Sequence, residues 1–303
     1  MMIVEKELET LKKYIINSLS DKNNHIANEI SDYLSAKSKR IRPTLVFLFA
    51  KAMGIEVDEK VYHLACSVEL VHNSTLVHDD ILDNADTRRG RVSLNYKLGN
   101  SLSVLAGDIL LSVALRELIK CNSVEAVDSF AESIYLMCKG EINQNFTIGK
   151  LPTMEEYIRK SEYKTAELFK APLTALCLIK NKSAKDNIHS FAKNFGIAFQ
   201  IKDDLLNVLK NDPTKPMMSD IHNGIYTAPV LYLNEDKSNI ENLSENEIIN
   251  LLQSDKKYIK QTVQLIKEYA DKAIEAITFI EDNQYKQEII KLTENLYKVG
   301  IDE

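Results

Sequence analysis

The chain is poor in the residues that end or bend secondary structure. Its 303 residues include only 9 glycines and 6 prolines, and they include no tryptophan. Helix-favouring residues such as Leu, Ile, Ala, Lys and Glu dominate instead, which indicates long helices joined by short connections. No stretch approaches the roughly 18 consecutive apolar residues that a membrane span requires. We therefore predict an all-α, soluble protein.

Closely spaced cysteines and excess basic charge are also missing. The cysteines stand singly in apolar segments, without the spacing of a metal knuckle or of a disulfide framework. The formal net charge of -6 argues against nucleic-acid binding, which needs a concentrated basic face. Residues 1–13 lack the apolar core and the cleavage site of a signal peptide. We expect a cytoplasmic protein with reduced thiols at Cys66, Cys121, Cys138 and Cys177.

Apolar positions repeat with helical spacing along most of the chain. The polar breaks between these segments are short, so we predict a single domain spanning residues 1–303. Pro172 falls inside one predicted helix, and we expect that helix to kink just after Lys164 and Thr165. The other main predicted helices are 44–53, 58–84, 103–121, 123–149 and 184–210.

Three carboxylates cluster where the predicted helix 58–84 ends. Asp79 and Asp83 are one turn apart, with Cβ atoms about 5–6 Å from each other, and Asp80 lies beside them. Mg²⁺ is typically held by one or two carboxylates, several waters and substrate phosphates, so such a pair suits it. An acidic helix end on its own is usually only solvated.

A second acidic cluster makes a functional interpretation more favourable. Asp203 and Asp204 directly follow the apolar segment that contains Gln200. Burying like charges without compensation is unfavourable, and a metal ion is the usual remedy. Two such clusters on facing helices would form a Mg²⁺ clamp around a diphosphate. Arg88 and Arg89, just after the first cluster, suit an anionic ligand that binds through two oxygens.

Other basic residues are ambiguous by themselves. Lys39 and Arg42 could be surface charges or anion ligands, and we expect Arg40 to point elsewhere. Lys164 lies in an otherwise apolar turn, which is more suggestive of a ligand. His72, six residues before His78 on the long predicted helix, is either a core histidine or a phosphate donor, and by itself the core histidine is favoured. His25, His63, His189 and His222 are assigned no chemistry.

These residues together resemble the trans-isoprenyl diphosphate synthases, the polyprenyl synthetase family. The resemblance extends from about Lys39 to Leu233, and its motifs occur in the order typical of the family. The matching segments are Lys39-Arg40-Ile41-Arg42-Pro43, Asp79 to Gly90, Leu105 to Asp108, Gly140 to Gln144, Lys164-Thr165-Ala166, Phe199 to Asp204, Lys215-Pro216, Asp220, and Gly224 to Pro229.

The resemblance implies a single all-α domain whose helices form a bundle around a deep central cavity, usually as a homodimer. It implies condensation of isopentenyl diphosphate with an allylic diphosphate. It also implies a Mg²⁺ cofactor, with three ions when diphosphate is bound. By the same resemblance Asp79, Asp83 and Asp203 bind the metal, with Asp80 and Asp204 in support.

The resemblance also assigns the basic and polar residues. The residues implied for the allylic diphosphate are Arg88, Lys164 and Lys215. Those implied for isopentenyl diphosphate are Lys39, Arg42, His72 and Arg89. Thr165, the Lys164 carbonyl and Gln200 are implied to shield the carbocation.

Four departures from the family pattern are found, one of them at a pair of residues. Lys37 and Ser38 replace a usual glycine pair, which changes the expected backbone contacts to isopentenyl diphosphate. Ile225 replaces a lysine found in many short-chain enzymes and is closer to long-chain synthases. Asn84 and Asn207 stand where acids often occur.

Product length is expected to depend on the helix that precedes Asp79. Ser74 and Thr75 are small, and Val71 continues their face at helical spacing, so the tunnel should admit a chain on the order of C30 to C50. Ser74→Phe should shorten the product. A shorter-chain synthase that makes farnesyl or geranylgeranyl diphosphate is the alternative.

Two rival functions share some of these features. A class I terpene cyclase or head-to-head condensing enzyme also uses aspartate-rich helices, but it would not need Lys39, Arg42 and Arg89 for isopentenyl diphosphate. A regulatory subunit of a two-subunit synthase usually loses the aspartate motifs, and this chain keeps both. If the enzyme is a heterodimer, the chain is therefore expected to be its catalytic subunit.

Overall fold

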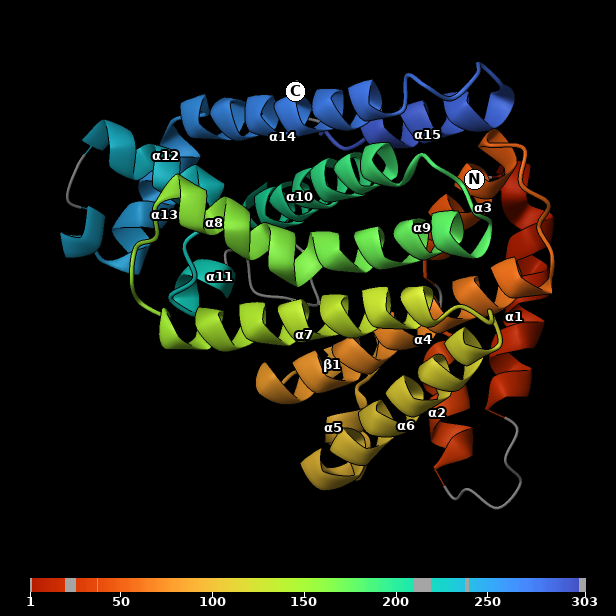
Figure 1. Ribbon diagram of the computed structural model, residues 1–303. Helices are drawn as coiled ribbons and strands as arrows, with labels where there is room; N and C mark the ends of the chain where they lie inside the picture. The colour runs from red at the N-terminus through yellow and green to blue at the C-terminus, as the bar shows by residue number, and fades with distance from the viewer. Residues whose placement is uncertain (1, 20–25, 37, 210–218, 238–239, 300–303) are drawn as a thin grey trace. The chain divides into compact units, whose positions relative to one another are not determined.

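The computed structural model describes residues 2–19, 26–36, 38–209, 219–237 and 240–299 (Figure 1). The regular secondary structure of the described residues is helical apart from one short β-hairpin, so the all-α prediction is confirmed. The chain forms two compact units, each assembled from separate stretches of sequence. Unit 1 comprises Met1–Phe130, Ala171–Lys185 and Ile280–Ile289, and unit 2 comprises Ala131–Lys170, Asp186–Phe279 and Ile290–Glu303.

Unit 1 is built from amino-terminal helices, and α7 and α9 contribute residues to both units. Its elements are η1 (Met2–Val4), α1 (Glu5–Ser18), α2 (Ala27–Leu34), α3 (Ile41–Ala52), α4 (Glu59–Leu82), β1 (Thr87–Arg88), β2 (Arg91–Val92), α5 (Leu94–Leu98) and α6 (Asn100–Ile119), followed by α7 (Val124–Phe146).

Helix α4 is the central helix of unit 1. Asp58 caps its amino end by accepting a hydrogen bond from the Val61 backbone N–H at 3.2 Å. Every residue from Leu64 to Val71 is buried, as expected for helical turns that are surrounded by other elements. It packs along α6 (Figure 1), where a Cβ added to Gly107 would overlap the His78 imidazole. The glycine therefore allows the close approach of α6 to α4.

The β-hairpin lies directly after the first acidic cluster and was not anticipated from the sequence. Strands β1 and β2 are antiparallel, with Arg88 opposite Arg91. Arg89 and Gly90 form the connecting turn, and both have positive φ, as a type I′ turn requires. Arg91 Nη1 donates to the Asp32 carbonyl at 2.9 Å, which ties the hairpin to α2. The hairpin thus gives two adjacent arginines fixed and different directions.

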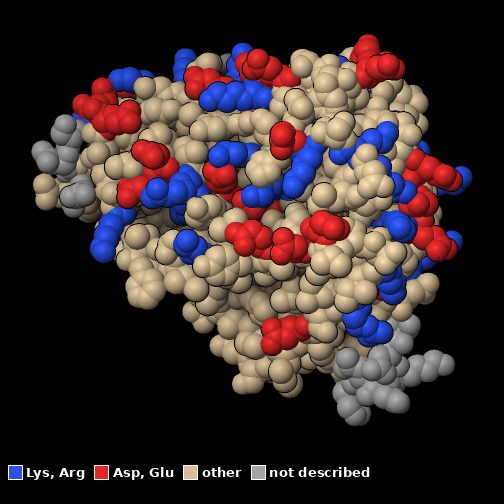
Figure 2. All heavy atoms as spheres, viewed as in Figure 1, with Lys and Arg blue, Asp and Glu red and all other residues tan. Residues whose placement is uncertain are grey.

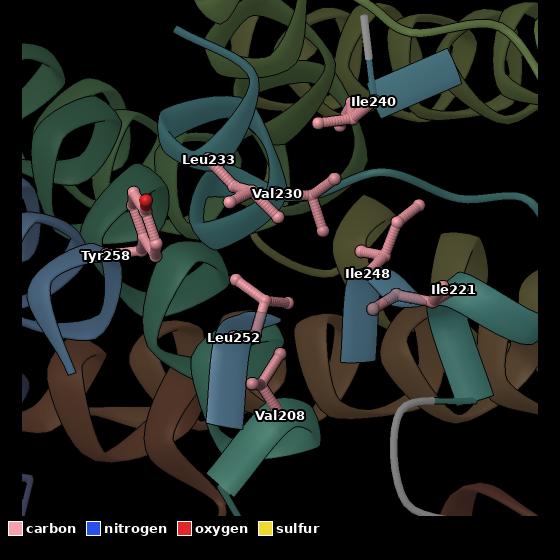
Figure 3. Packing of buried hydrophobic residues seen from close by; sticks show 8 residues of the cluster. All are labelled: Val208, Ile221, Val230, Leu233, Ile240, Ile248, Leu252 and Tyr258. Carbon is pink, nitrogen blue, oxygen red and sulfur yellow. The ribbon is translucent and has the colours of Figure 1, made fainter. Parts of the chain in front are cut away.

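Unit 2 contains the longest helix of the described chain, α10, and a separate apolar cluster. Figure 3 shows that cluster, in which α10, α11, α12, α13 and α14 contribute side chains around Val230 and Leu252. The remaining elements of the chain are α8 (Met154–Ser161), η2 (Glu162–Ala166), α9 (Glu167–Ile179), α10 (Lys185–Leu209), α11 (Ser219–His222), α12 (Ala228–Lys237), η3 (Ile240–Asn242), α13 (Glu245–Ser254), α14 (Lys257–Ala276) and α15 (Gln284–Glu294). Residues 171–179 of α9 and 284–289 of α15 belong to unit 1.

The expected distortion near Lys164 is present, but its position differs from the prediction. A π-helical turn spans Glu162–Ala166 and therefore contains Lys164 and Thr165, whereas the sequence suggested a kink just after them. Pro172 lies inside α9, one to two turns beyond. A π-turn widens the helix locally and is common at functional sites. The distortion therefore coincides with the motif instead of following it.

The described residues also show the distribution of apolar helices, thiols and surface charges. None of the described helices combines the length and the apolar character needed to span a lipid bilayer. The cysteines are unpaired, as expected for reduced thiols. On the face shown in Figure 2, Lys and Arg side chains are intermingled with Asp and Glu side chains and do not form one continuous basic area.

The cap at Asp58 predicts a measurable effect on stability. Asp58→Ala removes the acceptor for the Val61 N–H, and we expect a loss of about 1 kcal/mol in the free energy of unfolding. Urea denaturation followed by circular dichroism measures this loss. Glu56→Ala, which changes a nearby acid outside the helix, is the control, and an equal effect of both variants would contradict the capping role.

Candidate active site

The first acidic cluster lies at the carboxyl end of α4. Asp83 is the C-cap residue, and its backbone N–H donates to the Asp79 carbonyl at 2.8 Å, so the two acids are one helical turn apart as predicted. Asp83 is exposed and Asp79 is half-buried, while Asp80 is only 1% exposed. The cluster therefore contains two accessible carboxylates and one that faces the interior of unit 1.

The buried Asp80 pairs with Arg88 of the hairpin. Arg88 Nη2 and Nε lie 2.5 Å and 2.6 Å from Asp80 Oδ1. Asn95 Nδ2 donates to the Asp80 carbonyl at 3.1 Å, which fixes the turn that follows α4. A buried carboxylate needs such pairing because desolvation of an isolated charge is strongly unfavourable. Asp80 thus holds Arg88 beside the accessible acids.

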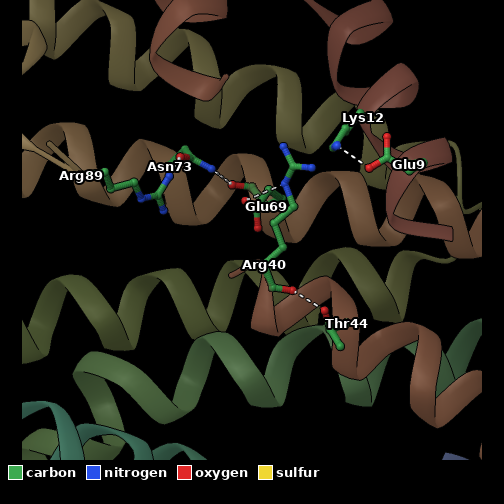
Figure 4. Close-up of polar contacts among 7 residues, drawn as sticks. All are labelled: Glu9, Lys12, Arg40, Thr44, Glu69, Asn73 and Arg89. Atoms are coloured by element: carbon green, nitrogen blue, oxygen red, sulfur yellow. Dashed lines mark hydrogen bonds and ion pairs between the residues drawn. The ribbon is translucent and has the colours of Figure 1, made fainter. Parts of the chain in front are cut away.

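A second group of basic residues surrounds the middle of α4 (Figure 4). Arg40 precedes α3 in a left-handed conformation with φ of 46°, and its Nε lies 3.8 Å from Glu69 Oε1. Arg89 Nη1 donates to Asn73 Oδ1 at 3.2 Å. Contrary to the sequence expectation, Arg40 therefore points toward the same turns of α4 as Arg89.

His72 lies among these arginines and is neutral at physiological pH. Burial lowers the pKa of His72 well below its ordinary value, and the positive charges of Arg42, Arg89 and Arg88 lower it further. A neutral imidazole can still donate one N–H to an anion. A bound diphosphate would counter the arginine charges around it. The sequence alone favoured a core histidine, whereas the structure places His72 in a strongly basic environment.

The second acidic cluster, in unit 2, has a similar division between an exposed and a buried acid. Asp203 is exposed, and Asp204 is 8% exposed. Tyr157 donates its hydroxyl to Asp204 Oδ2 at 2.6 Å, and Gln200 Nε2 donates to Asp204 Oδ1 at 2.7 Å. Burial and the nearby charge of Asp220 raise the pKa of Asp204 to about 6.

The same hydrogen-bond chain reaches the π-turn. Thr165 Oγ1 donates to Gln200 Oε1, so Thr165, Gln200 and Asp204 are linked in sequence. Lys164 Nζ lies 2.8 Å from Glu141 Oε2 of α7. Three residues predicted from the motifs, together with Lys164 of the same π-turn, are therefore brought together on α10 and the π-turn. Tyr157 is a further member that the sequence did not indicate.

Gly196 sets the distance between α10 and the π-turn. A Cβ added at Gly196 would overlap the Cα and Cβ of Ala166. Gln200 is one turn beyond Gly196 on the same face of α10, and Thr165 directly precedes Ala166. The glycine is thus required for the hydrogen bond between Thr165 and Gln200. A glycine within a helical pattern is a sequence signal of such close approach.

Lys39 and Lys215 are two further basic residues that the sequence predicts for the site. Lys39 is exposed. Lys215 lies outside the described residues. In the part of the chain that is described, no three carboxylate, imidazole or thiol groups gather closely enough to enclose a metal by themselves. Any metal would therefore need ligand oxygens from a substrate or from water, which is the usual situation for Mg²⁺.

The predicted chain-length residues lie on the inner side of α4. Val71 is 1% exposed and Ser74 is 2% exposed. Ser74 Oγ donates to the Gly107 carbonyl at 2.8 Å, and Thr75 Oγ1 donates to the His72 carbonyl at 2.8 Å. Ser74 thus faces α6, and a larger side chain there would have to occupy space beside that helix.

The chain is similar to known proteins in both sequence and fold. A model of the polyprenyl synthetase family matches residues 24–268. The chain belongs to this family. It is 34% identical to a prenyl transferase of Cyanophora paradoxa over 304 residues, which cover 97% of this chain and 90% of that protein. It is also 32% identical to the mitochondrial solanesyl-diphosphate synthase 1 of Oryza sativa subsp. japonica, covering 82% of this chain and 65% of that protein.

The fold comparison agrees with the family assignment. The heptaprenyl diphosphate synthase of Staphylococcus aureus superposes with a TM-score of 0.91 at 26% sequence identity, covering 98% of each chain. The resemblance to the trans-isoprenyl diphosphate synthases and the helical isoprenoid-synthase fold are therefore confirmed. For this polyprenyl synthetase, the family assignment rests on most of the chain and not on the aspartate motifs alone.

The packing at Gly196 predicts a destabilising substitution. Gly196→Ala forces α10 away from Ala166, and we expect it to lower the free energy of unfolding by about 1–3 kcal/mol, as overpacking does. Helix propensity alone predicts a stabilisation of roughly 1 kcal/mol for this change. Urea denaturation of the variant decides between them, because the two expectations have opposite signs.

Proposed function

We propose that this polyprenyl synthetase condenses isopentenyl diphosphate head-to-tail with an allylic diphosphate and makes a long-chain trans-polyprenyl diphosphate. The observation that carries the proposal is the pairing of an accessible acidic cluster with two differently directed arginines, Arg88 and Arg89, on one hairpin. The relatives named solanesyl and heptaprenyl diphosphate synthase support the long product.

The basic residues of unit 1 are suited to an anionic substrate. His72 lies in the field of Arg42, Arg88 and Arg89, which together favour a bound diphosphate. In this proposal Arg88 contacts the allylic diphosphate, while Arg42, Arg89, His72 and Lys39 bind isopentenyl diphosphate. Lys164 and Lys215 complete the allylic site. The prediction that both acidic clusters face each other within one domain is part of this proposal.

The predicted metal-binding carboxylates are suitable ligands for Mg²⁺. Asp79 and Asp83 are one turn apart, and Asp203 is an exposed carboxylate on α10, so hard oxygen ligands are present without a closed cage. When bound, Mg²⁺ would neutralise charge that develops on the departing diphosphate. Asp80 and Asp204 support these ligands through Arg88 and Tyr157. Three ions with bound diphosphate remain the expectation.

The chemistry then follows from the substrates and the residues around them. The allylic C–O bond breaks and the diphosphate leaves, the isopentenyl double bond attacks the allylic carbon, and a proton is lost to the diphosphate. Donors that are already oriented stabilise the developing negative charge without reorganisation. Thr165 and Gln200 are held by their mutual hydrogen bond, and with the Lys164 carbonyl they would shield the carbocation.

We further propose that the enzyme acts as a dimer. Helix α6 exposes Leu105 and Ile119, which are 55% and 64% accessible, and α7 exposes Tyr135 at 60%. Exposed apolar side chains that recur along helices commonly mark an interface between protein chains. A homodimer fits this pattern, and a heterodimer with a regulatory subunit is the alternative. The cytoplasmic location expected from the sequence stays a prediction.

The activity is testable with the purified chain. We expect radiolabelled isopentenyl diphosphate to be incorporated into a long product when Mg²⁺ and farnesyl or geranylgeranyl diphosphate are supplied. EDTA should abolish incorporation, and excess Mg²⁺ should restore it. Asp79→Asn and Asp203→Asn should each lower kcat/KM by roughly 10²-fold or more.

Asp128→Asn, an exposed acid on α7, serves as the control and should retain activity. Product formation without isopentenyl diphosphate would favour a cyclase. Absence of product with every combination of isopentenyl diphosphate and allylic diphosphate would indicate that the chain needs a second subunit.

Product length has its own test. Ser74→Phe places an aromatic ring beside α6 and should shorten the longest product, since the growing tail would meet it. Chromatography of dephosphorylated products measures this length. Ser103→Phe is the matched control, because Ser103 is also buried and its hydroxyl also donates to a backbone carbonyl, that of Gly99. A farnesyl endpoint for the unmodified enzyme would contradict the long-chain proposal.

A further inference from the structure

A carboxylate with no role in metal binding lies at the centre of the basic residues of unit 1. Glu69 is on α4 and is 3% exposed. Its Oε1 lies 3.8 Å from Arg40 Nε. Figure 4 shows the two side chains directed toward each other. Asn73 lies one turn further along the helix, beside Arg89 of the hairpin. Ten residues, nearly three helical turns, separate Glu69 from Asp79, so it does not belong to the acidic cluster.

Three guanidinium groups act on this one carboxylate. Burial raises the pKa of Glu69, and the charges of Arg40, Arg89 and Arg42, in that order, oppose the rise. One negative charge among three positive charges leaves an excess of about two positive charges. That excess is suited to a diphosphate, whereas three close guanidinium groups without Glu69 would repel one another.

Asn73 extends the contact from Glu69 to Arg89. Asn73 Nδ2 donates to the Glu69 backbone carbonyl at 2.7 Å, and Asn73 Oδ1 accepts from Arg89 Nη1 at 3.2 Å. The Asn73 side chain is therefore fixed from both ends. Arg89 itself is in a left-handed turn, so its backbone direction is set by the hairpin and its side-chain direction by Asn73.

We propose that Glu69 is a positioning residue that, with Asn73, holds Arg40, Arg42 and Arg89 in place for the diphosphate of isopentenyl diphosphate. This inference rests on the proposed function. In this proposal the Glu69 carboxylate neutralises Arg40, and Arg42 and Arg89 are the arginines that contact the substrate. Glu69 touches neither the substrate nor the metal. Its effect should therefore appear in substrate affinity and not in the chemical step.

The test is the effect of Glu69→Gln on the two substrates separately. The amide keeps the shape of the side chain but removes the charge that balances the arginines. We expect KM for isopentenyl diphosphate to rise by about tenfold or more, because the set loses its buried counter-charge. KM for the allylic diphosphate and kcat should stay within about threefold of the unmodified values.

A matched control separates this role from general stability. Glu117 on α6 is also 3% exposed, and it pairs with His63 at 2.6 Å and with Lys120, away from the arginine set. Glu117→Gln should lower the thermal midpoint without raising KM for isopentenyl diphosphate. An equal rise in KM for both variants, or an equal change in both substrates for Glu69→Gln, would overturn the proposal.

Conservative variants keep the proposal testable if Glu69→Gln does not fold. Glu69→Asp retains the charge and should give an intermediate KM for isopentenyl diphosphate. Asn73→Ala should raise the same KM by roughly threefold to tenfold, since it removes the side chain that links Glu69 to Arg89 but keeps the Glu69 charge. If these variants fold and bind isopentenyl diphosphate normally, the proposal is wrong. An unmodified chain without any activity would instead count against the proposed function itself.

Discussion

The pairing of buried carboxylates is the interaction on which the rest of the site depends. An ionised carboxyl group inside a protein is strongly unfavourable unless hydrogen bonds or opposite charges replace the lost water. In both acidic clusters the second aspartate is buried and held by the protein, Asp80 by Arg88 and Asp204 by its hydrogen-bond partners. The first aspartate, Asp79 or Asp203, is more exposed. The inner acid thus anchors the helix turn that presents the outer acid to a ligand.

Much of the fold and part of the site followed from the sequence. Helical spacing of apolar residues predicted the main helices to within a few residues, and α4 occupies Glu59–Leu82 where 58–84 was expected. Order and spacing of the motifs identified the family. The separation of Asp79 and Asp83 by one turn was correct because a helix fixes it locally. The grouping of Thr165, Gln200 and Asp204 was implied by family resemblance, and the structure shows the hydrogen bonds that produce it.

The missed features depend on contacts between residues far apart in the sequence. Helical spacing gives no sign that Tyr157 reaches Asp204, 47 residues later, or that Arg40 faces Glu69. The hairpin was missed because its strands are two residues long, too short for an alternating pattern. The π-turn lies before the expected kink, and Ala166 at its end packs closely against Gly196, a contact between distant residues that the sequence does not reveal.

The turn at Arg89 has a consequence for how this enzyme responds to selection. Position 89 has φ of 54°, a conformation that glycine and asparagine adopt more easily than arginine. Selection for thermal stability alone would therefore favour Gly or Asn there. In the proposed function Arg89 also binds the substrate diphosphate, so stability and activity would be opposed at position 89.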